Sequence, residues 1–191
     1  MEPWLVLASA SPRRAGILRD LGIPFRVRVS AADETLHPGE EGGAAVLRLA
    51  RAKAEAVARS ETLPVLAADT EVICDGRVLG KPESPASALS MLADLSGRTH
   101  EVVTGVCLII GSVARSGIER TSVTFAEMTE AERAWYVATG EPLDKAGGYH
   151  VAGRGGLFIE GISGSPSNVA GLPVRLVFRL AREAGLSLGP P

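Results

Sequence analysis

The chain has 191 residues, of which 46% are hydrophobic and 22% are charged, and its formal net charge at neutral pH is −2. This composition is typical of one sizeable globular domain, and the near-neutral charge gives no support for broad binding to nucleic acid or to a membrane surface. No apolar run reaches the roughly 20 residues of a membrane span, and residues 1–3 lack the basic start of a signal peptide. We therefore expect a cytoplasmic protein with a single domain over 1–191 and a flexible tail at 187–191.

The first predicted element is a buried strand at 4–8, an apolar run that breaks into a hydroxyl-rich segment. A helical pattern follows, with Pro12 in its first turn and two adjacent arginines beside it. The free N–H groups and the dipole of a helix start favour an anion, and guanidinium groups match phosphate oxygens. Ser9, Arg13 and Arg14 therefore predict a polyphosphate site.

A strand at 25–29, a polar loop at 30–43 and an amphipathic helix at 44–59 come next. The loop carries Glu34 among other acids, and the helix carries Lys53 among several arginines. A solvated loop acid and a solvated helix face are the alternatives to a functional role for these two residues.

A short buried strand is predicted at 64–68, ending at Asp69. Ligands and catalytic groups cluster just beyond the carboxyl ends of strands in open α/β sheets, so Asp69 is a candidate for binding a divalent cation or for accepting a proton from water. An ordinary loop carboxylate is the alternative. A hairpin at 72–79 with an Asp-Gly turn precedes Lys81, which the following proline keeps extended on a loop.

The rest of the chain continues the alternation of strands and helices. Helices are predicted at 85–95, from 129 to about 140 and at 173–184, and strands at 102–110, 118–125 and 157–160. Because the two long strands are expected to run antiparallel, we predict an α/β fold with a mixed sheet. The glycine-flanked loop at 144–149 indicates ligand contact through Lys145, or else a plain connection, and Ser167 or Asn168 is expected to cap the last helix.

Cysteine and histidine residues show no metal-binding spacing. Cys74 and Cys107 lie in apolar runs, which predicts buried thiols rather than zinc ligands. His37, His100 and His150 are far apart in the sequence, and we expect them at the surface. The candidate site is thus a set of cations and carboxylates without a covalent nucleophile motif, which is typical of metal-assisted phosphoryl chemistry.

Taken together, the motifs resemble the Maf family of nucleoside triphosphate pyrophosphatases from about residue 5 to residue 180. The motifs that carry the resemblance are Ser9-Ala-Ser-Pro-Arg-Arg14, Asp33-Glu34-Thr35, Arg51-Ala-Lys53-Ala, Ala68-Asp69-Thr70, Gly80-Lys81-Pro82, Thr99-His-Glu-Val-Val-Thr-Gly105, Asp144-Lys-Ala-Gly-Gly-Tyr149 and Gly164-Ser-Pro-Ser-Asn168-Val-Ala-Gly-Leu-Pro173. The resemblance implies an inosine-triphosphate-pyrophosphatase-like fold, with a mixed, elongated sheet flanked by helices and two lobes with a central cleft. It also implies a homodimer.

The implied reaction is metal-assisted attack of water on the α-phosphate of a nucleoside triphosphate, with Mg²⁺ or Mn²⁺ as the cofactor. The resemblance makes Asp69 the proton acceptor, places the metal at Glu34 and Asp69, and gives catalytic roles to Lys53 and Lys81. The residues that it implies for substrate binding are Ser9, Arg13, Arg14, Thr70, Lys145 and Ala152.

Substrate choice follows from three positions in the family. The branch that acts on dTTP and UTP carries an arginine, a threonine and a glutamine there, and this chain has Arg13, Thr70 and Ala152. The branch that acts on 7-methyl-GTP carries a tryptophan and a glutamine at the first two positions, which this chain lacks. The resemblance therefore favours dTTP and UTP, although Ala152 lacks the amide that could read a base edge.

Two alternatives stay open. The chain could be a pyrophosphatase for purine or non-canonical nucleotides. It could also be a nucleotide-binding regulator of septation without relevant turnover, because members of the family are linked to the arrest of cell division. A role in binding nucleic acid or membranes is not expected.

Overall fold

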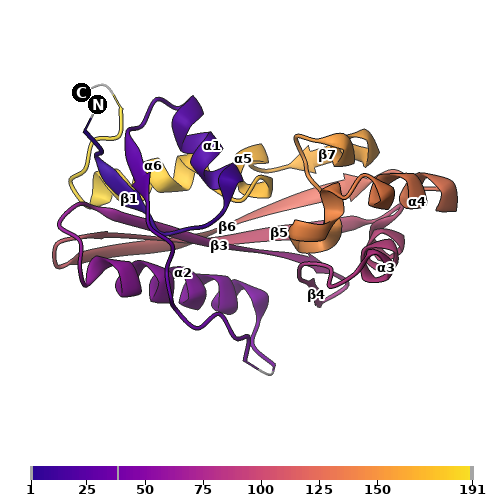
Figure 1. Ribbon diagram of the computed structural model, residues 1–191, viewed down its shortest axis with the longest axis horizontal. Helices are drawn as coiled ribbons and strands as arrows, with labels where there is room; N and C mark the ends of the chain where they lie inside the picture. Colours follow the sequence, from indigo (N-terminus) through magenta and orange to yellow (C-terminus); the bar gives the residue numbers. More distant parts are fainter. Residues whose placement is uncertain (1, 38, 190–191) are drawn as a thin grey trace. The chain divides into compact units, whose positions relative to one another are not determined.

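The computed structural model describes residues 2–37 and 39–189, and strands and helices alternate along them (Figure 1). Its strands are β1 (Leu5–Leu7), β2 (Phe25–Val27), β3 (Val65–Cys74), β4 (Arg77–Leu79), β5 (Thr99–Ile110), β6 (Val113–Phe125) and β7 (Ile159–Ser163). They form a seven-stranded sheet in the order β2-β1-β3-β5-β6-β7, with β4 beside β3. β1 is parallel to β2 and β3, whereas β3–β4 and β6–β7 are antiparallel. The predicted α/β class with a mixed sheet is confirmed.

The described helices match most of the predicted ones within a few residues. They are α1 (Pro12–Asp20), α2 (Gly42–Ala58), α3 (Pro85–Leu95), α4 (Glu130–Ala138), α5 (Pro166–Val169) and α6 (Val174–Glu183), with 3₁₀ turns η1 (Glu141–Asp144), η2 (Ala146–Gly148) and η3 (Arg154–Phe158). Capping boxes begin α3 at Ser84 and α4 at Thr129. None of the described helices is long and apolar enough to cross a lipid bilayer.

The chain divides into two compact units. The first contains the chain through Asp69, Thr104–Glu119 and the segment from Gly171 onward, and the second contains Thr70–Val103 and Arg120–Ala170. β3, β5 and β6 each contribute residues to both units.

In the first unit, helices cover both faces of the strands, with α2 on one side and α1 and α6 on the other (Figure 1). Side chains of a strand alternate between the two faces, so Leu66 joins the core with α1 and α6 whereas Ala67 joins the core with α2. Gly105 of β5 permits a close approach of α2, because a Cβ at this position would lie 2.4 Å from the carbonyl oxygen of Val46. The apolar runs of the sequence thus become strands that are buried on both faces.

In the second unit, α3 packs against α4 and η2 over a separate apolar core. Three rings at its centre make mutual edge-to-face contacts, with centroids 4.8–5.3 Å apart: His100, Phe125 and Tyr149. His100 Nε2 and the Tyr149 hydroxyl form a hydrogen bond of 2.9 Å. The prediction of a surface position is wrong for His100. Its side chain is 3% exposed, because the imidazole ring packs against the two aromatic rings.

Two other sequence predictions need correction. β3 does not end at Asp69 but continues to Cys74, because its second half pairs with β4 as Val72 faces Leu79. Asp69 therefore lies in the middle of a strand.

The predicted cap of the last helix is also wrong. The hydroxyl of Ser165 accepts a hydrogen bond from the backbone N–H of Asn168 and caps the short α5, whereas α6 begins after Pro173 without a side-chain cap. Asn168 is fully buried, and its amide donates to the carbonyl of Val102 (2.9 Å).

The cysteine prediction is confirmed, since Cys74 and Cys107 are free and buried. Of the flexible tail predicted at 187–191, residues 190–191 lie outside the described residues. Leu188 is 5% exposed and packs in the core that contains α6, and the hydroxyl of Ser187 donates to the carbonyl of Gly189 (2.9 Å).

Burial of His100 makes the stability of the fold depend on pH. Burial lowers the pKa of His100 to about 4, below the ordinary value of 6.5. The unfolded chain therefore binds one more proton between these values, so the stabilisation is complete above pH 6.5 and is lost as the pH falls toward 4. We expect a loss of about 3 kcal/mol over this interval from this group, in urea unfolding measured at successive pH values.

The variant H100F should unfold with a weaker pH dependence between pH 6.5 and 4, whatever its absolute stability. The same change at His37, which is exposed, is the matched control. An H100F variant with the parent's slope would contradict the assignment.

Candidate active site

Ser9, in the segment between β1 and α1, is hydrogen-bonded to Arg14 in the first turn of α1. Ser9 is buried just beyond β1, which ends at Leu7, and its hydroxyl accepts hydrogen bonds from the backbone N–H of Ser11 (3.1 Å) and from Nη1 of Arg14 (3.0 Å). Ser11 caps α1. Arg14 Nε donates to the carbonyl of Gly171 (2.8 Å), so both ends of the guanidinium are held by protein atoms. The predicted phosphate-binding loop is therefore a rigid cationic element.

A buried lysine joins the two candidate carboxylates. Lys53 Nζ lies 2.6 Å from Oδ1 of Asp69 and 2.7 Å from Oε2 of Glu34. The side chain of Lys53 is 9% exposed and that of Asp69 is 13% exposed, whereas Glu34 is 57% exposed. The alternative of a solvated helix face is thus excluded for Lys53, and the acidic loop brings its carboxylate to the same ammonium.

The alternation of β3 explains why Asp69 meets Lys53. Val65 and Ala67 point to the face of the strand that packs on α2, and Asp69 continues this series two residues further. Lys53 is one of the buried positions of α2, beside Ala54 and Ala50. The faces of β3 and α2 that pack in the same core therefore also carry the two partners of the ion pair, Asp69 and Lys53.

The cationic loop and the ion-paired residues are in electrostatic contact. Burial lowers the pKa of the Arg14 guanidinium; the charge of Asp69 opposes this shift, the neighbouring Arg13 adds to it, and Glu34 opposes it again. These residues with Ser9 and Lys53 are the six predicted site residues that the first unit brings together. Like charges at Arg13 and Arg14 indicate a site that gains stability from an anionic ligand.

The loop that carries Glu34 is fixed by Arg48 of α2. Its guanidinium donates to both oxygens of Glu40 (2.7 and 2.6 Å) and to the carbonyl of Thr35 (3.1 Å). The hydrogen bond from Arg48 lowers the pKa of Glu40 to about 2, so this contact persists throughout the physiological range. The role of Arg48 could not be predicted from the sequence, because only the folded loop shows which arginine of the helix faces it.

Four predicted site residues belong to the second unit: Thr70, Lys81, Lys145 and Ala152. Two of the loops concerned lie side by side, since the backbone N–H of Gly147 donates to the carbonyl of Gly80 (3.0 Å). Lys81 is exposed, whereas Lys145 is 9% exposed and donates from Nζ to the carbonyl of Glu141 (2.8 Å). Gly147 has a φ of +69°, and a Cβ there would lie 2.9 Å from Val72, so only glycine fits this turn.

Ala152 lies on an exposed turn between Tyr149 and η3. Thr70 follows Asp69 in β3, so its side chain points to the opposite face of the strand.

The donor set fits a magnesium-type cation. No three His, Cys, Asp or Glu side chains form a metal-binding group within residues 2–37 and 39–189. Mg²⁺, however, is commonly held by one or two carboxylates together with substrate phosphates and water, rather than by a complete protein cage. Glu34 and Asp69, which share one ammonium as their partner, match this requirement.

A mixed α/β fold whose site combines guanidinium, ammonium and paired carboxylate groups is typical of enzymes that act on phosphate groups. A family model described as Maf-like protein matches residues 4–184. The chain belongs to the Maf family.

Curated relatives agree with this assignment over nearly the whole chain. A dTTP/UTP pyrophosphatase of Anaeromyxobacter sp. (strain Fw109-5) is 52% identical over 186 residues, covering 95% of this chain and 89% of the relative. A protein of the same name from Moorella thermoacetica is 51% identical over 187 residues and covers 96% of both chains. A third, from Deinococcus radiodurans, is 46% identical over 186 residues, or 97% of this chain and 95% of the relative.

Solved structures that match part of this chain include two Ham1 proteins. The one from Coxiella burnetii gives a TM-score of 0.46 at 19% identity and covers 66% of this chain and 75% of its own. The one from Staphylococcus aureus gives a TM-score of 0.45 at 16% identity, with coverage of 64% and 72%.

Replacement of Arg48 tests how the acidic loop is held. In R48A, the segment that contains Thr35 and Glu40 loses its attachment to α2, and we expect faster amide hydrogen exchange in peptides that cover residues 30–37. The midpoint of thermal unfolding should fall only modestly, because this ion pair is partly buried at the surface and not part of the core.

Arg59 is exposed at the end of the same helix, so R59A is the matched control and should exchange like the parent. Unchanged exchange in R48A would show that other contacts hold the loop.

Proposed function

We propose that this protein is a nucleoside triphosphate pyrophosphatase that hydrolyses dTTP and UTP to the monophosphate and pyrophosphate. The observation that carries the proposal is the buried Lys53, which holds Asp69 and Glu34 within 2.7 Å, beside the guanidinium of Arg14. The names of the curated relatives support the proposed substrate, and the set of cations and carboxylates at the site supports the reaction class.

In the proposed reaction, water attacks the α-phosphorus and the bond from this phosphorus to the α,β-bridging oxygen breaks. One proton of the water passes to Asp69, and the electron pair of the broken bond leaves on pyrophosphate. Because Lys53 binds Oδ1 of Asp69, the other carboxylate oxygen is the proton acceptor. Lys53 also keeps the carboxylate oriented, so that little reorganisation is needed when the proton arrives.

The arginines would neutralise the phosphates. Arg14 is oriented by Ser9 and by the carbonyl of Gly171, and this fixed geometry favours binding of phosphate oxygens in one arrangement. Arg13 adds a second charge at the start of α1, where the helix dipole also favours an anion. We assign further contacts with the nucleotide to Thr70, Lys81, Lys145 and Ala152.

Glu34 and Asp69 would hold a divalent cation, Mg²⁺ or Mn²⁺. When bound, this ion would screen the phosphate charge and acidify a water molecule, which matters because a carboxylate is a weak base for bulk water. A homodimer, a location in the cytoplasm and a link to the arrest of cell division stay predictions.

The activity can be tested on a panel of dTTP, UTP, ITP, XTP and 7-methyl-GTP with Mg²⁺ or Mn²⁺. We expect pyrophosphate release with dTTP and UTP and no activity after chelation of the metal. A preference for ITP or XTP would contradict the proposed substrate, and tight binding without turnover would favour the regulator.

The variant D69N should reduce kcat by a factor of about 10³ while retaining much of the affinity for the nucleotide, because it removes the proton acceptor and keeps the size of the side chain. The matched control is D20N, since Asp20 is an exposed aspartate at the end of α1. Turnover by D69N comparable to that of D20N would exclude Asp69 as the base.

A further inference from the structure

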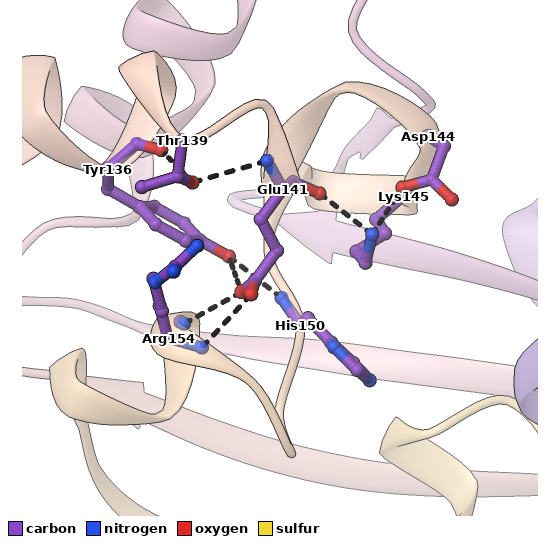
Figure 2. Close-up of polar contacts among 8 residues, drawn as sticks. Tyr136, Thr139, Glu141, Asp144, Lys145, His150 and Arg154 are labelled. Carbon is purple, nitrogen blue, oxygen red and sulfur yellow. Dashed lines mark hydrogen bonds and ion pairs between the residues drawn. The ribbon is translucent and has the colours of Figure 1, made fainter.

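Glu141, at the start of η1, contacts several segments of the second unit at once (Figure 2). One carboxylate oxygen accepts hydrogen bonds from the hydroxyl of Tyr136 (2.8 Å) and from the backbone N–H of Gly155 (3.0 Å). The other accepts from the backbone N–H of Arg154 (3.1 Å). The carbonyl of Glu141 accepts from Lys145 Nζ (2.8 Å). A single residue thus connects α4, the buried lysine and the loop before β7.

The loop of residues 150–155 is held at both ends by this arrangement. At its start, the backbone N–H of His150 donates to the Tyr136 hydroxyl (3.1 Å), which in turn donates to Glu141. At its end, the carboxylate binds the loop directly. The loop approaches the helix closely at Gly155, because a Cβ there would lie 2.6 Å from the Tyr136 hydroxyl.

The charge on Glu141 is stable at neutral pH. Burial raises the pKa of this carboxyl, but hydrogen bonds from Gly155, Tyr136 and Arg154 and the charge of His150 outweigh burial and lower it overall. Burial and the bond to Glu141 in turn raise the pKa of Tyr136, so its hydroxyl keeps the proton that it donates. The loop is therefore held by charge-assisted hydrogen bonds, which are stronger than neutral ones.

We propose that Glu141 is a positioning residue for base selection, acting through the 150–155 loop. Ala152, in the middle of this loop, has no side-chain donor or acceptor, so at this position only the backbone N–H and C=O groups can distinguish a uracil edge from a cytosine edge. Backbone groups discriminate only as well as the loop is fixed, and Glu141 fixes it. This inference rests on the proposed function, because it assumes that the loop meets the base of the substrate.

The experiment compares two variants with the parent protein. E141Q keeps the size of the side chain but replaces one carboxylate oxygen with an NH₂ group. This group is a donor and cannot accept a hydrogen bond from a backbone N–H. Y136F removes only the hydroxyl from a fully buried ring and serves if E141Q does not fold. The matched control is E132Q on the same helix, where Glu132 accepts two hydrogen bonds from Thr129 and none from the loop.

Two quantities are measured: the affinity for the α,β-methylene analogues of UTP and CTP by calorimetry, and amide exchange in peptides covering 149–156. For E141Q and Y136F we expect the preference for the uracil analogue to fall about tenfold, the effect of losing one charge-assisted hydrogen bond, together with faster exchange of the loop. E132Q should behave like the parent in both.

An unchanged preference in both variants would overturn the proposal, as would a parent protein that binds the two analogues equally. Both outcomes are distinct from failure of the proposed function, which is read from the parent alone as absence of pyrophosphate release from dTTP and UTP. Faster exchange with an unchanged preference would show that Glu141 only stabilises the loop.

Discussion

The buried ammonium of Lys53 is the interaction on which the candidate site depends. A lysine that is 9% exposed loses most of its hydration, and this loss must be offset by nearby charge. Asp69 and Glu34 offset it from two elements that are far apart in sequence, a core strand and a polar loop. The two carboxylates surround one ammonium, and this arrangement leaves carboxylate oxygens suited to a cation.

The same interaction ties the site to the core of the first unit. Asp69 points toward α2 because β3 alternates in the way that its buried neighbours require, and α2 approaches the strands closely because β5 carries Gly105. Arg48 then holds the acidic loop on the outer side of the helix. Arg14, buried beside Asp69, supplies the positive charge that a polyphosphate needs. In this unit, the packing of the core therefore also determines where the charged side chains lie.

Local sequence signals predicted the elements but not every boundary. The Pro12 helix start, the Thr129 capping box and the Asp-Gly hairpin are set by residues within a few positions of one another, and the structure confirms them. The apparent strand end at Asp69 was misleading because pairing with β4, which lies later in the chain, carries β3 onward. His100 was misplaced for a related reason, since its aromatic neighbours come from distant segments.

The site residues also divide into those that local sequence signals predict and those whose role depends on the tertiary fold. Ser9 and Arg14 could be predicted as a unit because a strand–loop–helix motif is local, whereas the convergence of Glu34, Lys53 and Asp69 on one point requires the tertiary fold. Arg48 and Glu141 could not be predicted, because their roles consist of contacts to backbone groups that no side-chain pattern reveals. The resemblance to the family predicted the residue types at the site, and the structure explains the positions of several of these residues.

The central claim is that water attacks the α-phosphorus of the nucleotide. Hydrolysis of dTTP in water enriched in ¹⁸O, followed by ³¹P NMR of the products, tests it most directly. The account predicts that the label enters the thymidine monophosphate and that the pyrophosphate is unlabelled. Label in pyrophosphate, or products that are a nucleoside diphosphate and labelled phosphate, would contradict it.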